Sequence, residues 1–542
     1  MIMYDWVKSD LQNFGQYYSG DNEVRDLSNE DIDIAFIGSG LSSTFTLIEY
    51  INQLEEMPSL KTSHGNDSVR IIMFEKDSWL WGGIPYGRRS GFTSLIITPL
   101  DEFLPESELS SFIEWMSENI DWLIVPFKQN AGNRSKKWLE DCEEKIRLKK
   151  SARIHIPRYF FGIYIWEKLK NACSTSNKSI KLDFINAEVN SIKQNEKGDF
   201  NICVNSEINF SANQILLGIG IPQIRSLGEM NTKLNDVVFL KDPYFPNLES
   251  SITMISNYVK KRNSSKILIV GANASALELI YQITNYIDVD ENNLHFTVMS
   301  PQGKLPGLFI KDKQTTFKAN SLNELSISGH EIKADMILDA LKQDLDDANK
   351  NNFDISDTLP IFTNHVGGLV QRLSKKEKQK FISFHGVEIG RLQRRAGLEY
   401  TQPVEELSLT NKLDVIKGKF INFSKDTDVT KVLFKKDNVS ETQMDRYDVV
   451  INCAGSSGLT EAGMSPLLKQ LIESGICSST SSNHGLKVGD NFEVMPGFYI
   501  NGPLLAGNVV GEMGIWHVEH CGRIIGFAKK IAANILDEAN PL

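Results

Sequence analysis

The pattern of apolar and polar positions is the same in two distant parts of the chain. In the first, a run of β-branched and aromatic residues over 32–37 ends in glycines, and apolar residues then recur at helical spacing from Leu41. A second apolar run over 69–76 follows a polar loop. Residues 266–300 repeat this order of strand, turn, helix and strand. Two such units predict an α/β fold with two Rossmann-like dinucleotide-binding domains, each a parallel sheet flanked by helices.

The rest of the chain indicates how the two units are connected. Helical patterns continue to about residue 172, and short alternating segments then return to a core strand at 214–218. A polar, largely helical region spans about 305–410, in which we expect the Asp- and Asn-rich segment 344–354 to be an exposed loop. Strands resume at about 411, and the chain ends with a strand, glycines and a helix. The second unit is therefore predicted to interrupt the first domain.

Length, charge and cysteine usage narrow the class of protein. A chain of 542 residues is too long for one core, and a formal net charge of -11 argues against a nucleic-acid partner. The N-terminus lacks the apolar core of a signal peptide, and no window approaches the roughly 20 apolar residues of a membrane span. The six cysteines form no C-x-x-C pair, which disfavours a disulfide reductase. We expect a soluble, cytoplasmic protein, and the sequence does not indicate its oligomeric state.

The first glycine turn, Gly38 to Ser43, has the chemistry of a pyrophosphate-binding loop. Gly38 permits a tight turn, Gly40 lets the backbone approach the pyrophosphate, and Ser43 is small enough for close packing of helix on strand. Glu75 ends the next strand, where an acid typically hydrogen-bonds the ribose. A glycine-rich turn in an unrelated α/β domain is the alternative. The flanking strand and helix, together with Glu75, favour a dinucleotide site.

The second glycine turn, Gly271 to Ala276, is a looser form of the same motif. Asn273 replaces the middle glycine and tolerates unusual backbone angles, and Ser275 can add a hydroxyl contact to phosphate. The following strand ends at Ser300 without an acid, and Lys304 lies just beyond. Asp or Glu there would repel the 2′-phosphate of NADPH, whereas we expect Ser300 and Lys304 to bind it, so the segment favours NADPH over NADH. A structural duplicate that has lost its ligand is the alternative.

Two further glycine-containing segments can flank a flat cofactor ring. One follows the ribose acid and combines adjacent glycines with aromatic residues, although a plain aromatic loop would have the same composition. The other precedes the final helix, whose N-terminus would stabilise negative charge on a reduced flavin. The candidate contacts are Gly83, Pro85 and Tyr86 in the first segment and Gly502, Pro503 and Gly507 in the second.

The order of these motifs resembles the two-dinucleotide-binding flavoproteins that include flavin-containing and N-hydroxylating monooxygenases. It is more closely similar to a largely uncharacterised bacterial family of FAD/NAD(P)-binding proteins. The resemblance extends from about residue 31 to 535 and includes the segments GGIPYG, TPLDEFLP, IPRYFFGIYI, KDPYFPNL, LIVGANASALELIY and NGPLLAG. It departs from the related pattern at Ser43, at Gly218-Ile219-Gly220, and at Asn508, where related flavoproteins often carry Asp.

The resemblance implies which cofactor each turn holds. FAD would bind at Gly38, Gly40, Ser43, Glu75 and the 502–507 turn, and a nicotinamide cofactor at Gly271, Asn273 and Ser275. We therefore expect a lead-in over 1–30, an FAD-binding domain over 31–249 and 411–542, and an inserted NAD(P)H-binding domain with a helical insertion over 250–410.

These parts predict an FAD-dependent, NAD(P)H-driven oxidoreductase with a small-molecule substrate. The leading hypothesis is a monooxygenase that hydroxylates a small amine or amino acid through a flavin C4a-hydroperoxide. The alternatives are a flavin oxidoreductase or oxidase without oxygen insertion, and a dinucleotide-binding sensor or interaction protein. His517 and Arg88 are candidate catalytic side chains, with His520 and Arg89 beside them, and a structural role is the alternative for each. No metal site is predicted.

Overall fold

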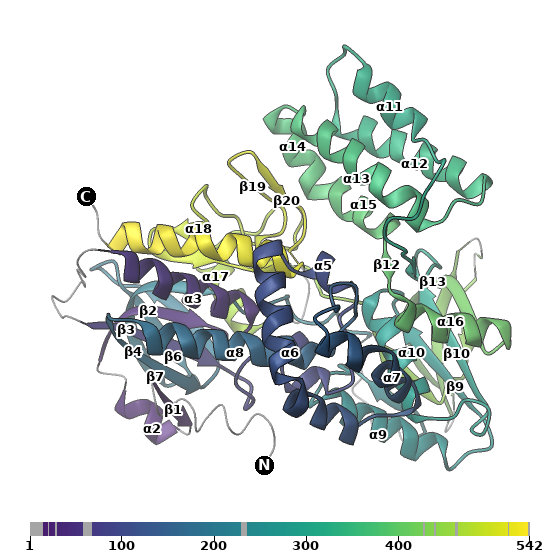
Figure 1. The fold of residues 1–542 in the computed structure, drawn as a ribbon, viewed down its shortest axis with the longest axis horizontal. Helices are drawn as coiled ribbons and strands as arrows, with labels where there is room; N and C mark the ends of the chain where they lie inside the picture. The colour runs from purple at the N-terminus through teal and green to yellow at the C-terminus, as the bar shows by residue number, and fades with distance from the viewer. Residues whose placement is uncertain are drawn as a thin grey trace.

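The computed structural model describes residues 15–19, 21–27, 30–57, 68–228, 236–426, 429–437, 439, 441–460, 464–518 and 520–539. These residues form two α/β halves, each built on its own sheet, and a group of helices that projects beside the second half (Figure 1). Most of the polar loop predicted between the first two strands lies outside the described residues.

The first sheet contains nine strands among the described residues, in the order β1-β4-β3-β2-β7-β18-β17, with β5 and β6 as an antiparallel excursion beside β7. Neighbouring strands from β1 to β18 are parallel, and β17 runs antiparallel to β18. β2, β3 and β7 are central and bury apolar residues on both faces, as parallel strands do. The strands are β1 (Gly15–Ser19), β2 (Asp31–Ile37), β3 (Ser68–Glu75), β4 (Ser179–Asn186), β5 (Val189–Gln194), β6 (Phe200–Val204), β7 (Ile208–Leu217), β17 (Glu493–Met495) and β18 (Phe498–Ile500).

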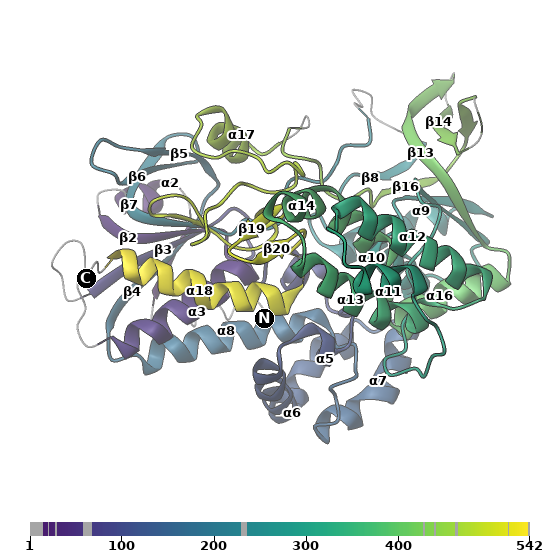
Figure 2. The same cartoon turned by 90° about the horizontal axis from the view of Figure 1, so that it is seen from above.

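Three long helices, α3, α8 and α18, lie together along this first sheet (Figures 1 and 2). α3 is buried along nearly its whole length because α8 and the C-terminal helix α18 both pack on it. The helices of this half are α2 (Asp21–Asp26), α3 (Leu41–Glu56), α4 (Gly83–Tyr86), α5 (Leu100–Phe103), α6 (Glu106–Gln129), α7 (Asn133–Arg147), α8 (Arg158–Thr175), α17 (Pro466–Glu473) and α18 (Cys521–Ala539).

The second sheet contains seven strands within the described ranges, in the order β15-β14-β13-β10-β9-β16-β8. β13, β10, β9, β16 and β8 are parallel, and β13 continues into an antiparallel hairpin with β14. Its elements are β8 (Val238–Leu240), α9 (Leu248–Val259), β9 (Ser265–Val270), α10 (Ala274–Tyr286), β10 (Leu294–Ser300), α16 (Leu398–Leu409), β13 (Leu413–Asp426), β14 (Val429–Lys436), β15 (Gln443–Asp445) and β16 (Val449–Asn452).

The helical insertion stands on a short stalk, in which β11 (Gly307–Leu308) pairs with β12 (Arg395–Ala396). It has an apolar core of its own around Phe317, Phe362 and Phe381. It projects from the second half and contacts the C-terminal hairpin of β19 (Asn508–Val510) and β20 (Met513–Ile515) (Figure 1). The insertion consists of α11 (Asn320–Ile327), α12 (Ala334–Lys350), α13 (Ile355–Gln371), α14 (Lys375–Lys380), a π-helical turn (Phe381–His385) and α15 (Gly386–Leu392).

The sheets divide the chain at other points than the predicted boundaries at 249 and 410. β8 and β13 to β16 belong to the second sheet, so that half begins near Val238 and extends to Asn452. Short apolar strands have the same composition in either parallel sheet, so the sequence could not assign them. The lead-in also contributes structure, because β1 pairs with β4. Residues 344–350, predicted as a loop, are helical and end α12.

Candidate functional site

The first glycine turn lies where β2 ends, between the ends of β3 and β7. Gly38 has a φ of 96°, and a Cβ there would lie 2.8 Å from the Gly218 carbonyl oxygen, so the turn requires glycine. Gly40 is the N-cap of α3, with an ordinary φ of -76°. A Cβ at Gly40 would meet only the Cα of Gly83, at 3.8 Å, among the described residues. The backbone of Gly40 therefore has an open face that a ligand can approach.

Ser43 and Glu75 enclose this turn from two sides. Ser43 is fully buried against Gly218, where a Cβ would collide with the serine hydroxyl. Glu75 Oε2 accepts hydrogen bonds from the Ser39 N–H at 2.9 Å and the Ser39 hydroxyl at 2.8 Å, and Oε1 accepts one from the Asp77 N–H at 3.0 Å. A carboxylate has about four lone-pair positions, so one position remains for a ribose hydroxyl.

The glycine-rich segment after β3 folds back against this turn. Gly83 has a φ of 58°, and an added Cβ would lie 3.4 Å from the Cα of Gly40. Tyr86 packs its ring on Phe161, with 5.4 Å between the ring centroids, and Pro85 is exposed. The structure therefore brings Gly83 to the first glycine turn and makes Tyr86 part of an aromatic cluster.

The turn over residues 501–507 crosses the start of α3. Gly502 has a φ of 94°, and a Cβ there would collide with the Ser42 hydroxyl. Asn501 Nδ2 donates to Thr46 Oγ1 at 2.9 Å, which fixes the crossing. Pro503 begins a short 3-10 helix, and Gly507 has a φ of 88°. β18, the last strand of the first sheet in chain order, therefore leads directly to the first glycine turn.

The prediction that this turn leads directly into a helix is wrong. The hairpin of β19 and β20 follows the turn, and α18 begins only at Cys521. Asn508 holds the start of the hairpin, because Nδ2 donates to the carbonyls of Leu486 and Leu505 at 2.8 and 2.9 Å. Its Oδ1 accepts from the Val488 N–H at 3.1 Å. Both amide protons are used within the protein, so Asn508 cannot donate to a flavin in this arrangement.

Three buried polar atoms in the segments around the first glycine turn have no partner among the described residues. They are Ser43 Oγ, Trp81 Nε1 and Asn501 Oδ1. Buried polar groups are almost always hydrogen-bonded, so such atoms call for an explanation. The first turn of α3 also lacks a side-chain cap, which leaves its N–H groups and its positive dipole end for an anion. These groups fit a dinucleotide, which offers phosphates and polar ring edges.

The second glycine turn occupies the same place in the second sheet, at the end of β9. Gly271 has a φ of 115°, and a Cβ there would collide with the Cys453 carbonyl. Asn273 is the N-cap of α10, and no side chain caps the helix. The backbone of Asn273 is extended, with φ -120° and ψ -165°, so the turn does not draw on the tolerance of Asn for unusual backbone angles. The half-buried Ser275 lies in the first turn of α10.

Ser300 and Lys304 differ in their availability to a ligand. Ser300 is buried at the end of β10, and its hydroxyl oxygen accepts from the Gly303 N–H at 3.0 Å. Lys304 is exposed, and no described residue forms an ion pair with it. A phosphate group beside this turn would therefore meet the Lys304 ammonium first, whereas Ser300 shapes the turn.

His517 and His520 lie before the last helix, α18, rather than on it. Burial lowers the pKa of His517 to about 4, and the Arg523 charge adds to this effect. Burial also lowers the pKa of His520, whose Nε2 contacts the Glu102 carbonyl. Both imidazoles are therefore neutral near pH 7.

Arg88 and Arg89 connect the two halves of the molecule. Arg88 Nη1 donates to Glu249 Oε2 at 2.8 Å, and its guanidinium lies 4.8 Å from the Phe92 ring centroid. Arg89 is buried and donates to Asp242 Oδ2 at 2.5 Å. These contacts support the structural alternative for both arginines rather than contact with a substrate.

Sequence reasoning missed Arg158 and Glu278, which the structure brings together between the two sheets. Glu278 is 1% exposed, and its Oε2 lies 3.1 Å from Arg158 Nη2. Its other oxygen, Oε1, has no partner among the described residues. A charged residue in the apolar pattern of α10 was the signal available in the sequence.

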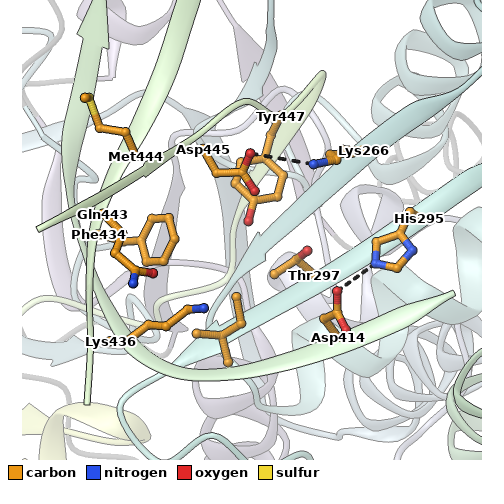
Figure 3. A pocket seen from close by; sticks show the side chains of 11 residues that line it. Lys266, His295, Thr297, Asp414, Phe434, Lys436, Gln443, Met444, Asp445 and Tyr447 are labelled. Carbon is orange, nitrogen blue, oxygen red and sulfur yellow. Dashed lines mark hydrogen bonds and ion pairs between the residues drawn. The ribbon is translucent and has the colours of Figure 1, made fainter. Parts of the chain in front are cut away.

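A cavity of about 580 Å³ lies on the second sheet, at the amino ends of β9, β10 and β13 (Figure 3). Two pairs of ionisable side chains contact each other there: His295 Nε2 lies 2.8 Å from Asp414 Oδ2, and Lys266 Nζ lies 3.6 Å from Asp445 Oδ1. Open α/β sheets bind their ligands at the carboxyl ends of the strands. This cavity therefore lies away from the second glycine turn.

The described residues contain no group of three or more His, Cys, Asp or Glu side chains that could hold a metal ion. All six cysteines are free. Within the same residues, no helix combines the length and the apolar character that a membrane crossing requires.

Residues 35–222 match a family model described as FAD-NAD(P)-binding. This segment contains the first glycine turn, Glu75 and β7. Over 95% of its length, the chain matches the fold of a two-dinucleotide-binding-domain flavoprotein, and each half of the described residues contains a largely parallel sheet. The resemblance predicted from the motifs is therefore confirmed at the level of the domain and the fold.

Particular relatives add detail to this class. The chain is 26% identical over 521 residues to an uncharacterized protein of Mycobacterium tuberculosis, covering 94% of this chain and 96% of the relative. It is similar in structure to the cadaverine monooxygenase DfoA of Erwinia amylovora bound to FAD, with a TM-score of 0.52, 10% identity and 95% of both chains covered.

Two further solved structures share this fold. Ornithine hydroxylase from Pseudomonas aeruginosa matches with a TM-score of 0.55 and 11% identity, over 94% of this chain and 100% of that one. L-lysine 6-monooxygenase from Pseudomonas syringae matches with a TM-score of 0.51 and 13% identity, over 94% and 99%.

Proposed function

We propose that the chain is an FAD-dependent, NADPH-driven monooxygenase that hydroxylates a small amine or amino acid. The observation that carries the proposal is the pair of glycine turns, each at the carboxyl end of a parallel strand and before a helix without a side-chain cap. The monooxygenases of similar fold are named for cadaverine, ornithine and lysine, all of which carry a primary amine.

The two cofactors have separate sites in this proposal. FAD binds at the first turn through backbone groups and the α3 dipole, with Glu75 on the ribose. NADPH binds at the second turn, with the exposed Lys304 near its 2′-phosphate. The residues assigned to FAD are Gly38, Gly40, Ser43, Glu75, Gly83, Gly502, Pro503 and Gly507, and those assigned to NADPH are Gly271, Asn273, Ser275 and Lys304.

When bound, FAD supplies the redox chemistry: it accepts a hydride from NADPH and passes electrons to O2. The protein's part is to bind, orient and exclude water. The helical insertion serves the last purpose, because Gln379 Nε2 donates to the Gly507 carbonyl at 2.9 Å. Lys378 Nζ also pairs with Glu512 Oε2 at 2.7 Å. These two contacts hold the insertion against the hairpin that follows the 501–507 turn.

Product analysis tests the proposed reaction. The FAD-loaded chain is mixed with NADPH and O2 in the presence of ornithine, lysine or cadaverine, and hydroxylated amine and hydrogen peroxide are both quantified. The proposal predicts that one substrate stimulates NADPH consumption and yields hydroxylated amine in proportion to the NADPH used. Hydrogen peroxide in equal amount to NADPH with every amine would instead indicate an oxidase.

A further inference from the structure

α10 begins at the second glycine turn and buries a row of polar side chains along its length. Glu278, Gln282 and Asn285 are 1%, 2% and 1% exposed. Residues four and seven positions apart lie on one face of a helix. Side chains of these types are rarely so buried unless they are paired. Together with Thr284 and Tyr286, they form what we call the α10 polar face.

The first part of this face binds the segment that follows the glycine-rich loop. Gln282 Oε1 accepts from Thr93 Oγ1 at 3.0 Å, and Gln282 Nε2 donates to Ser94 Oγ at 3.1 Å. Glu278 Oε2 pairs with Arg158 at 3.1 Å and accepts from the Tyr244 hydroxyl at 2.6 Å. Arg158 starts α8 of the first half, so this carboxylate spans both halves of the molecule.

The second part of the face binds the loop between α6 and α7 and the start of α7. Asn285 Oδ1 accepts from the Ser135 N–H at 2.9 Å, and Asn285 Nδ2 donates to Ser135 Oγ at 2.8 Å. Arg134 Nε donates to Thr284 Oγ1 at 2.8 Å. The Tyr286 hydroxyl donates to the Asn130 carbonyl at 2.7 Å. Each partner belongs to the first half.

Such an interface resists rotation more than an apolar one does. Apolar surfaces can slide without losing specific partners, whereas each buried polar group that loses its partner incurs a desolvation penalty. The ion pairs of Arg88 with Glu249 and of Arg89 with Asp242 also link the same two halves.

We propose that the α10 polar face positions the nicotinamide site against the flavin site, and that the two halves keep this arrangement throughout the reaction cycle. The proposal rests on the proposed function. Hydride transfer would break a C–H bond of the dihydronicotinamide and form a bond between the transferred hydrogen and the flavin, so that the flavin gains two electrons and is reduced while the nicotinamide is oxidised. This step depends steeply on the distance between the two rings. Glu278, Gln282 and Asn285 are therefore positioning residues.

Two variants and a control test the positioning role. Gln282→Leu removes two interdomain bonds but leaves Ser94 bonded to the Ser90 carbonyl at 2.6 Å and Thr93 bonded to Tyr286 at 2.8 Å. A triple variant adds Arg158→Met and Glu278→Gln, in which the new amide still accepts from Tyr244. Gln371→Leu makes the same chemical change on the exposed surface of α13.

The readout is stopped-flow reduction of the bound flavin under anaerobic conditions over a range of NADPH concentrations. We expect the limiting rate constant to fall about threefold in Gln282→Leu and roughly 10- to 100-fold in the triple variant. FAD content, reduction by dithionite and the apparent Kd for NADPH should stay near the parent values, as should every property of Gln371→Leu. A triple variant that keeps its FAD and reduces within about twofold of the parent rate would overturn the positioning role.

Small-angle X-ray scattering tests the fixed arrangement independently of catalysis. The parent chain should give the same scattering profile with and without NADP⁺, and the triple variant should give a larger radius of gyration. A change of profile in the parent on adding NADP⁺ would overturn the fixed arrangement. If NADPH and NADH both fail to reduce the parent flavin, the proposed function fails, and the scattering result still decides whether the halves are held together.

Discussion

Gly38 and Gly40 are two residues apart and serve different purposes. Gly38 has a positive φ and faces the Gly218 carbonyl, so the fold itself requires glycine there. Gly40 has an ordinary φ, and an added Cβ would meet only Gly83 among the described residues. The described part of the protein therefore does not itself require glycine at position 40. We attribute this glycine to a ligand that passes close to the backbone.

Gly40→Val should separate cofactor binding from folding. The Cβ makes only an ordinary contact of 3.8 Å with the Gly83 Cα among the described residues, and the side chain would stand in the proposed path of the pyrophosphate. We expect a folded protein with a thermal midpoint within a few degrees of the parent apoprotein and a loss of FAD affinity of at least about 100-fold, which corresponds to about 2.7 kcal/mol. Absorbance at the flavin band and thermal denaturation measure the two properties. A yellow variant with one FAD per chain would show that the first turn is misassigned, and Gly38→Val serves as a contrast that should fail to fold.

Glu75→Ala should weaken FAD binding because it removes the carboxylate that we assign to the ribose and that accepts two hydrogen bonds from Ser39. Loss of one charged hydrogen bond costs about 1.5–3 kcal/mol, so we expect roughly a 10- to 100-fold increase in the Kd for FAD. Titration of the apoprotein with FAD measures it. Glu75→Gln retains an acceptor for Ser39 and should lie between parent and alanine variant. Equal affinity in all three proteins would rule out the ribose role.

Residues whose task is local were predictable from the sequence. Gly38 and Ser43 act within one strand–turn–helix unit, and their roles follow from their spacing. Arg88 and Asn508 were not predictable, because their partners lie far along the chain. Arg88 meets Glu249, 161 positions away, and Asn508 meets Leu486, 22 positions away. A candidate contact to substrate or flavin and a structural contact look the same until the partner is known.

At the scale of the element, the start of α10 offers a direct test of the second cofactor site. Ser275→Asp places a negative charge in the first turn of α10, where it would repel the pyrophosphate of NADPH. We expect the NADPH concentration for half-maximal flavin reduction to rise about tenfold or more, while FAD content remains unchanged. Because an acid favours a free helix N-terminus, the apoprotein should not be destabilised. Parallel loss of FAD and NADPH would show that the two sites are not separate.

The predictions that were wrong at this scale concern where helices begin and end. Residues 344–350 have a loop-like composition, yet Asp344 is 1% exposed and its two oxygens accept from the N–H groups of Ser321 and Leu322 at 2.8 and 2.9 Å. It thereby caps α11 from within α12. The sequence of the C-terminal segment likewise did not distinguish a turn that leads into a helix from a turn that leads into a hairpin.

At the scale of the whole molecule, burial of His517 makes stability depend on pH. Its pKa is about 4 in the folded protein and 6.5 ordinarily, so the unfolded chain binds the proton first as pH falls. This contribution is complete above pH 6.5 and is lost progressively towards pH 4. Between pH 7 and 5 it amounts to at most about 2 kcal/mol of unfolding free energy. Denaturant unfolding at pH 7 and pH 5 measures the loss of unfolding free energy, which should be smaller in His517→Gln than in the parent. Identical losses in the two proteins would contradict the burial of His517 in its neutral form.

Two sheets and a helical insertion were predictable because each rests on a period repeated over many residues, and the two glycine turns were predictable from short motifs between a strand and a helix. The division of the chain between the sheets was not, since β8 and β16 join the second sheet through pairings that no local pattern encodes. The α10 polar face follows the same logic. Its residues have a visible spacing, but the first half that binds them is brought there only by the complete fold.

The assignment of FAD and a nicotinamide cofactor to this chain is tested most directly by its visible spectrum. The spectrum is recorded before and after anaerobic mixing of the purified chain with NADPH, and separately with NADH. We expect a yellow protein with one FAD per chain that bleaches on mixing, and faster with NADPH because of Lys304. Faster bleaching with NADH would contradict only one assignment, that of Lys304 to the 2′-phosphate of NADPH. A colourless protein that cannot be reconstituted with FAD would contradict the central claim.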